Sequence, residues 1–176
     1  MMKFSHIVIV FITFFASAGM AVSQTSSGTQ EYGDGGAYEG EFLNGLPHGN
    51  GTYELPNGYR YVGEWFEGEI NGQGEALFPN GSVYIGSFVK GKPEGSGKIT
   101  FTDGGTYEGE WANGSITGEG YAKYANGTTY QGTFLDAMHD GKGIMKSPDG
   151  YIYDGTWENG VKQGKATVTY PDGSIY

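Results

Sequence analysis

Few residues of this chain have side chains and spacings suited to catalysis. Beyond the first 23 residues the sequence holds two histidines, His48 and His139, and no cysteine. A Ser-His-Asp arrangement needs a positioned histidine, and a metal site needs several convergent donors. Asp140 beside His139 comes nearest to such a pair, and no nucleophile lies close to it in the sequence. We expect both histidines to end loops in solvent, and we predict no catalytic residue, no metal ligand, no cofactor and no enzyme activity.

Pairs of glycines separated by one residue, such as Gly72 and Gly74, are the second candidate for chemistry. Phosphate-binding and dinucleotide-binding loops use such pairs at the N-terminus of a helix. With 34 glycines, the sequence leaves no room for a 3.6-residue apolar pattern, so these pairs open strands and carry no phosphate-binding signal. The net charge of −10 also argues against nucleic acid, whose binding depends on clustered Lys and Arg. No nucleic-acid partner is predicted.

The elements that would position any site repeat every 23 residues. We number each repeat from its tyrosine as position 0; glycine follows at position 2 and Phe or Trp at position 4. Glycine recurs at position 11, and Asn-Gly or Asp-Gly at positions 19 and 20. Such self-similarity is the signature of a repeat architecture. The repeat-defining residues are Tyr38, Tyr61, Tyr84, Tyr107, Tyr130 and Tyr153; Gly40, Gly63, Gly86, Gly109, Gly132 and Gly155; and Phe42, Trp65, Phe88, Trp111, Phe134 and Trp157.

Each repeat is predicted to be a strand, a loop, a second strand and a turn. Positions 0, 2 and 4 of a strand share one face, so the large aromatics point the same way and are expected to be buried between repeats. The second strand is expected to begin near the glycine at position 13. Pro-Asn-Gly or Pro-Asp-Gly then makes the turn, as at 56–58 and 148–150. The predicted fold is all-β: an elongated single-sheet meander of tandem β-hairpin repeats, with about twelve to thirteen strands.

The pattern Tyr-x-Gly-x-Trp/Phe-x-x-Gly-x-x-x-Gly-x-Gly at this period resembles the MORN (membrane occupation and recognition nexus) repeat. Six repeats start at 38, 61, 84, 107, 130 and 153 and occupy 38–176, and 24–37 form a linker and an N-terminal half-repeat cap. Ala137 and Ala166 replace glycine at positions 7 and 13, which costs little unless φ is positive there. Tyr176 begins a seventh repeat, so either the sequence is a fragment or assembly covers that edge.

Residues 1–23 have the layout of a signal peptide. Lys3 precedes an apolar run from Ile7 to Phe15, and small residues follow up to Ser23, after which we expect cleavage. The alternative is an uncleaved anchor, but the apolar stretch is shorter than the roughly 20 residues that span a bilayer. We therefore expect a protein that is exported to a periplasmic, extracellular or envelope location.

The resemblance implies a non-catalytic scaffold for protein-protein interaction or self-assembly. One alternative is a glycan or cell-wall binding module, with Tyr59, Tyr121 and Tyr151 as candidate surface contacts lining a groove. A second is membrane-lipid binding, which the charge disfavours, because residues 24–176 carry 9 basic and 20 acidic side chains and thus −11. A third is an accessory region of a larger enzyme such as a lipid kinase, although nothing in the 176 residues resembles a catalytic domain.

Overall fold

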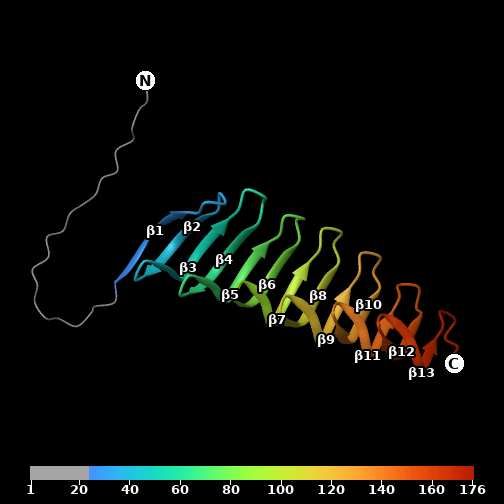
Figure 1. Cartoon of the computed structure of the whole chain (residues 1–176). Helices are drawn as coiled ribbons and strands as arrows, with labels where there is room; N and C mark the ends of the chain where they lie inside the picture. The colour runs from blue at the N-terminus through green and yellow to red at the C-terminus, as the bar shows by residue number, and fades with distance from the viewer. Residues whose placement is uncertain (1–23) are drawn as a thin grey trace, which may run out of the picture.

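The computed structural model describes residues 24–176, which form one open, 13-stranded antiparallel sheet (Figure 1). Each strand pairs with its neighbours in the sequence, so the predicted all-β meander is confirmed. Within these residues no helix has the length and apolar character needed to cross a bilayer. The expected signal peptide, residues 1–23, lies outside the described residues. The strands are β1 Thr25–Glu31, β2 Ala37–Leu43, β3 Leu46–Glu54, β4 Arg60–Phe66, β5 Glu69–Leu77, β6 Val83–Val89, β7 Lys92–Thr100, β8 Thr106–Ala112, β9 Ser115–Lys123, β10 Thr129–Leu135, β11 Met138–Lys146, β12 Ile152–Glu158 and β13 Val161–Thr169.

The second strand of each repeat begins at position 8, earlier than the expected position 13. Asn44 and Gly45 between β2 and β3 have φ of 52° and 81°. Positive φ at both central residues defines the type I′ turn, which joins two strands with only two residues. The glycine at position 11, Gly49 in repeat one, lies inside the strand with φ of 65°. The expected loop is therefore a tight hairpin, and the glycines at positions 11 and 13 are interior to the strand.

The predicted Pro-Asn-Gly turns occur at the opposite ends of the strands. Between β3 and β4, the Gly58 amide donates to the Leu55 carbonyl at 3.0 Å, and the Tyr59 amide donates to Asn57 Oδ1 at 2.9 Å. The side chain of Asn57 thus satisfies an amide that no strand partner reaches. The same turn precedes repeat one, where the Gly36 amide donates to Asp34 Oδ1 at 2.9 Å. This turn connects β1 to β2, and the two strands pair along their whole length.

Each tyrosine at position 0 lies over a pair of glycines from two adjacent strands. In repeat two, Gly63 faces Gly74 across β4 and β5, and a Cβ added to Gly74 would lie 2.5 Å from Cε2 of Tyr61. The Tyr61 hydroxyl donates to the Glu64 carbonyl at 3.0 Å. The ring therefore covers bare backbone and satisfies its own polar atom, which explains why positions 2 and 13 need glycine.

The face that carries positions 0, 2 and 4, here called the aromatic face, forms a continuous row of rings along the ribbon. Tyr38 contacts Phe42 of its own repeat edge-on at 5.2 Å between ring centroids, and it contacts Trp65 of the next repeat at 4.8 Å. The pattern recurs in later repeats, for example with Tyr61 and Phe88 at 5.0 Å. The predicted burial of the tryptophans is confirmed, since Trp65, Trp111 and Trp157 are 5–7% exposed. Stability thus comes from contacts between neighbouring repeats.

The two alanine replacements behave differently. Ala137 has φ of 63°, because position 7 is the second residue of the type I′ turn. This is the exception that the sequence-based expectation of a small cost allowed for, since an alanine in the left-handed region is strained. Ala166 has no positive φ, and its Cβ lies where the ring of Tyr153 would approach a glycine. Tyr153 nevertheless donates to the Thr156 carbonyl at 3.1 Å, so the motif persists in repeat six.

Candidate functional site

The two histidines lie in strands rather than in solvent-exposed loops, which corrects the expectation from sequence. His48 belongs to β3 and contacts Phe66 with ring centroids 5.4 Å apart. His139 belongs to β11 at position 9, where repeats one to four carry Pro or Ile, and it is half-buried in the aromatic face. Its position in an apolar column gives the physical reason, because an imidazole ring packs well against other rings.

His139 is enclosed by aromatic side chains from three repeats. Its ring stacks on Tyr130 with centroids 3.7 Å apart and also contacts Trp157 at 4.9 Å. The Tyr124 hydroxyl and His139 Nε2 are 2.6 Å apart. Burial lowers the pKa of His139, because desolvation disfavours the charged imidazolium. No group of three or more His, Asp or Glu side chains is placed to hold a metal ion anywhere in the described part of the chain.

The three tyrosines proposed as surface contacts do not line a common groove. Tyr59 and Tyr151 occupy position 21 and pack against the buried residues of the aromatic face. Tyr121 occupies position 14 and points to the opposite face, where it is 44% exposed. The reason is the alternation of side chains along a strand, since Tyr121 neighbours the buried Ala122 and must therefore point the other way.

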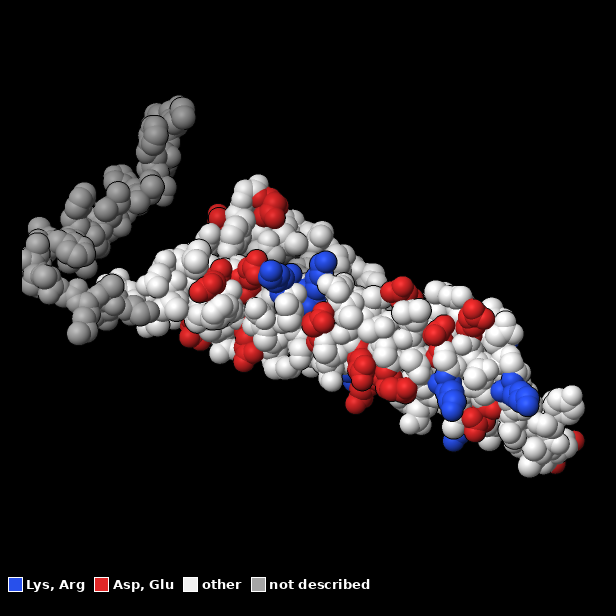
Figure 2. Space-filling view, turned by 60° about the horizontal axis from the view of Figure 1, so that its bottom comes forward, with Lys and Arg blue, Asp and Glu red and all other residues white. Residues whose placement is uncertain are grey.

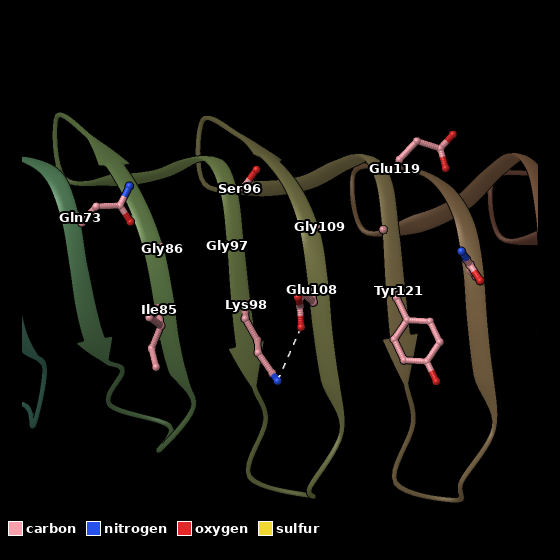
Figure 3. A pocket seen from close by; sticks show the side chains of 12 residues that line it. Gln73, Ile85, Gly86, Ser96, Gly97, Lys98, Glu108, Gly109, Glu119 and Tyr121 are labelled. Carbon is pink, nitrogen blue, oxygen red and sulfur yellow. Dashed lines mark ion pairs between the residues drawn. The ribbon is translucent and has the colours of Figure 1, made fainter.

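A large hollow lies on the face of the sheet opposite the aromatic face. It has a volume of about 680 Å³ and spans β5 to β10 (Figure 3). Its floor is the backbone of glycines at positions 2 and 13, whose tyrosines lie on the other side of the sheet. We call it the outer groove and define it by its side chains: Gln73, Ile85, Ser96, Lys98, Glu108, Glu119, Tyr121 and Gln131.

The side chains of the outer groove can form hydrogen bonds and stack, but they do not form a catalytic arrangement. Lys98 and Glu108 form an exposed ion pair at 3.6 Å, which Figure 3 shows at the middle of the groove. Glu119 accepts a hydrogen bond from the Thr133 hydroxyl at 2.9 Å. Tyr121 faces Glu108 on one neighbouring strand and Gln131 on the other. Polar groups around an exposed ring and a bare backbone are features of a binding surface.

Acidic side chains outnumber basic ones over the face seen in Figure 2, where the basic residues lie among them. This distribution agrees with the charge of the described residues, which is 9 − 20 = −11. The outer groove has one lysine, Lys98, and two glutamates, Glu108 and Glu119. Complementary partners of this surface would carry positive charge, because opposite potentials steer association.

An apolar column that was not predicted from the sequence lies at position 17, just before each Pro-Asn-Gly or related turn. Phe101 and Tyr124 of this column are 38% and 40% exposed on the aromatic face. The signal in the sequence is the 23-residue spacing of these apolar residues, beside turn residues whose role is to set the backbone conformation. The column consists of Tyr32, Leu55, Phe78, Phe101, Tyr124 and Tyr170, with Ser147 as the exception.

Similar architectures occur among solved structures. The TCP domain of Drosophila melanogaster SAS-4, in complex with a proline-rich motif of Ana2, is similar with a TM-score of 0.52, 11% sequence identity and coverage of 96% of each chain. The TCP10c domain of Drosophila melanogaster Sas-4 is also 11% identical, and the match covers 88% of this chain and 97% of that one, with a TM-score of 0.45. At such identities the likeness concerns the fold alone. Comparison with curated protein sequences finds no match.

The match to a sequence family is specific and repeats in register with the structure. A family model described as MORN repeat matches the chain six times, each time starting at one of the predicted repeat tyrosines. The matched segments are 38–58, 61–83, 84–106, 107–129, 130–150 and 153–175. They cover most of the chain and each includes the tyrosine, glycine and aromatic positions of its hairpin, so the chain belongs to the MORN repeat family.

Proposed function

We propose that this protein is a non-catalytic scaffold that binds a partner protein along its ribbon. The observation that carries the proposal is the outer groove, a hollow of about 680 Å³ that crosses six adjacent strands. A groove that runs across strands is extended along the ribbon, and it suits an extended polypeptide better than a compact ligand. Exposed Tyr121 and the Lys98–Glu108 pair supply contacts of the kind that protein interfaces use.

The solved structures support the same proposal. The SAS-4 domain with the similar fold was determined in complex with a proline-rich motif, that is, with a short segment of another protein. A segment of that kind is extended and loses little conformational entropy on binding, because proline restricts its backbone before it binds. An equivalent segment with positively charged residues would complement the −11 charge of this ribbon.

The test is a pull-down in which residues 24–176 are immobilised on a resin and incubated with extract from the native source. Sedimentation velocity of the same residues measures self-association. Tyr121→Ala combined with Lys98→Glu should abolish retention of a specific partner, because both changes lie in the outer groove. Tyr170→Ala is the matched control, since Tyr170 is an equally exposed tyrosine outside the groove. Retention of the partner by the groove variant would contradict the proposal.

Export through a cleaved N-terminal segment forms part of this proposal. The support is the sequence of residues 1–23, with Lys3, a short apolar run and small residues before Ser23. Expression of the full-length chain in its native source, followed by N-terminal sequencing of the mature protein, tests it. A mature protein that begins at Gln24 is expected, and one that begins at Met1 would contradict it.

Glycan binding is a second candidate, and one observation favours it. Tyr121 is an exposed ring flanked on the neighbouring strands by Glu108 and Gln131, so a sugar ring that stacked on it would meet polar side chains on both sides. Binding to a panel of cell-wall polysaccharides that is lost in Tyr121→Ala and kept in Tyr121→Phe would support it. A folded protein that binds none of the panel would exclude this candidate.

A further inference from the structure

A second and smaller hollow lies on the aromatic face between repeats three and five. It has a volume of about 160 Å³ and opens between the exposed rings of Phe101 and Tyr124. Its floor is Ala122, and its walls include Ile116 and Phe134. A cavity of about 150 Å³ with apolar walls is large enough to hold a benzene ring. We call this hollow the Ala122 pocket.

The chain contains a second copy of this site, 46 residues earlier, in which the same space has an occupant. The walls and floor of the two copies correspond one to one, and the identical pairs include Ile70 and Ile116, Ala76 and Ala122, and Phe88 and Phe134. In the earlier copy, Tyr59 packs against the buried core, and its ring lies 6.0 Å from that of Phe78. Burial raises the pKa of the Tyr59 hydroxyl, as expected of a ring seated among apolar side chains.

Gly105 stands where Tyr59 stands in the earlier copy, and its missing side chain accounts for the pocket. The third copy again has a tyrosine, Tyr151, which contacts Tyr170 at 6.2 Å between ring centroids. Among these three copies, which are spaced by two repeats, only the central one therefore lacks the ring; the alternate repeats carry Ser82, Thr128 and Ser174 at this position. Phe101 and Tyr124 are exposed at the mouth, whereas their counterparts Leu55 and Phe78 are half-buried beside Tyr59.

The backbone at Gly105 does not itself require glycine. Its φ is not positive, and an added Cβ would lie 3.0 Å from Asp103 Oδ1, 3.4 Å from the Lys123 carbonyl oxygen and 3.7 Å from Cδ2 of Phe101. The Gly105 amide donates to Asp103 Oδ1 at 2.8 Å, and the Tyr59 amide makes the equivalent bond to Asn57 in the presence of a full side chain. The absence of a side chain at Gly105 thus leaves an open apolar space at little cost to the turn.

We propose that the Ala122 pocket receives an aromatic side chain of a partner protein, which takes the place that the chain's own tyrosines fill in the two flanking copies. The proposal deepens the scaffold function and rests on it. The aromatic residue of the partner lies next to positively charged residues, because the ribbon carries −11. Ile116 forms an apolar wall of the pocket and offers no hydrogen-bond partner to a phenol hydroxyl. In the third copy, Lys162 stands at the same position and donates to the Tyr151 hydroxyl at 3.0 Å.

Two short peptides test the pocket without knowledge of the partner. Acetyl-Gly-Lys-Phe-Lys-Gly-amide and the same peptide with Ala in place of Phe are titrated into isotope-labelled residues 24–176, and binding is followed by NMR. The two peptides share their charge, so their difference isolates the ring. The Phe peptide should bind about tenfold tighter or more, as burial of a phenylalanine side chain predicts, and the largest shifts should occur at Ala122 and Tyr124.

Gly105→Tyr fills the pocket from within and should remove the preference for the Phe peptide while raising the melting temperature. Gly105→Ser is the matched control, because serine occupies this position at Ser82 and Ser174 and adds no ring; it should keep the preference. If Gly105→Tyr does not fold, Ala122→Met serves in its place, since Met145 occupies that position in repeat five.

Three results would overturn the inference. Equal affinity for the Phe and Ala peptides would show that the pocket accepts no ring, and a preference kept by folded Gly105→Tyr would place binding elsewhere. A dimer in sedimentation that Gly105→Tyr dissociates would identify a second copy of the chain as the occupant. If the pull-down retains a partner through the outer groove while the peptides bind equally, the scaffold function stands and only the pocket assignment fails.

Discussion

The imidazole of His139 and the phenol ring of Tyr130 lie face to face, with centroids 3.7 Å apart and an angle of 15° between their planes. Every other contact between neighbouring rings of the aromatic row is edge-on or tilted. The stack exists because His139 occupies an apolar position of the repeat, and burial there lowers its pKa. A titratable group in this row makes stability depend on pH.

The first prediction concerns acid. The pKa of His139 is lowered in the folded state, so the unfolded chain takes up a proton first as the pH drops. The stability that the neutral imidazole contributes is therefore full above the ordinary histidine pKa of about 6.5, and it is lost as the pH falls through the folded value. His139→Ile places the side chain found in repeats two and four and should flatten this dependence. Melting temperatures from pH 8 to pH 5 measure it, and equal slopes for both proteins would refute the prediction.

The second prediction concerns alkali. Burial raises the pKa of Tyr84, Tyr107 and Tyr130 to about 12. The folded chain therefore keeps these protons where the unfolded chain loses them, and stability present below pH 10 is lost as the pH rises toward 12. Tyr84→Phe removes the bond to the Ser87 carbonyl at 3.0 Å and should cost about 1 kcal/mol at neutral pH. Urea unfolding at pH 7 and pH 11 checks both points, because the variant should lose less stability than wild type at the higher pH.

The third prediction tests the glycine pairs beneath the tyrosines. Gly74→Ala places a Cβ 2.5 Å from the Tyr61 ring and should destabilise the protein by about 3 kcal/mol, because ring and backbone cannot both move away. Gly33→Ala is the control, since no atom lies within 4 Å of an added Cβ there and φ is not positive. Similar free energies of unfolding for the two variants would show that the ring does not enforce glycine.

The fourth prediction uses a natural exception. Ala137→Gly should stabilise the protein by about 1 kcal/mol, because it removes a Cβ from the left-handed region at φ of 63°. The reciprocal change, Gly160→Ala, should cost a similar amount at the same position of repeat six, where φ is 80° and the nearest atom to a Cβ lies 4.0 Å away. Chemical denaturation of the pair, with opposite signs expected, provides the measurement.

The fifth prediction distinguishes two tryptophans at the same position of the repeat. Trp111 Nε1 donates to the Gly97 carbonyl at 3.2 Å, whereas Trp65 Nε1 is buried without an acceptor among the described residues. Phenylalanine stands at this position in odd repeats, so the substitution keeps an aromatic ring in the row. Trp111→Phe should therefore cost about 1 kcal/mol more than Trp65→Phe in thermal unfolding. A larger loss at Trp65 would show that its indole has a partner in solution.

Much of the ribbon could be predicted because each repeat places the same residue types at the same positions. The tyrosine, glycine and aromatic columns share a face by simple alternation, and their burial followed from that pattern alone. Asn57 and Asp149 marked turns through side chains that bond their own backbone two residues on. These features depend only on contacts within one repeat or between adjacent ones.

The first residue of the second strand in each repeat was harder to predict, because it depends on backbone conformation rather than on composition. Glycine at position 11 looks like a loop residue, yet in β3 it is a left-handed residue within the strand, beside a register shift between Gly40 and Phe42. Alternation of side chains does not reveal how many residues such a shift inserts. Tyr59 and Tyr121 were wrongly expected on one surface, because Tyr121 lies next to the buried Ala122 and points to the opposite face, whereas Tyr59 packs against the aromatic face.

The sequence by itself determined the family, the 23-residue hairpin and the set of buried rings, because these follow from local periodicity. Only the tertiary structure decided that His139 lies in the aromatic row, that Ala137 is strained and that Tyr121 faces a groove on the opposite side of the sheet. It also decided that Gly105, an ordinary turn glycine in the sequence, leaves a pocket above Ala122. The physical reason is that a cavity depends on the side chains that several strands bring together, and a missing ring becomes visible only beside the copies that have one.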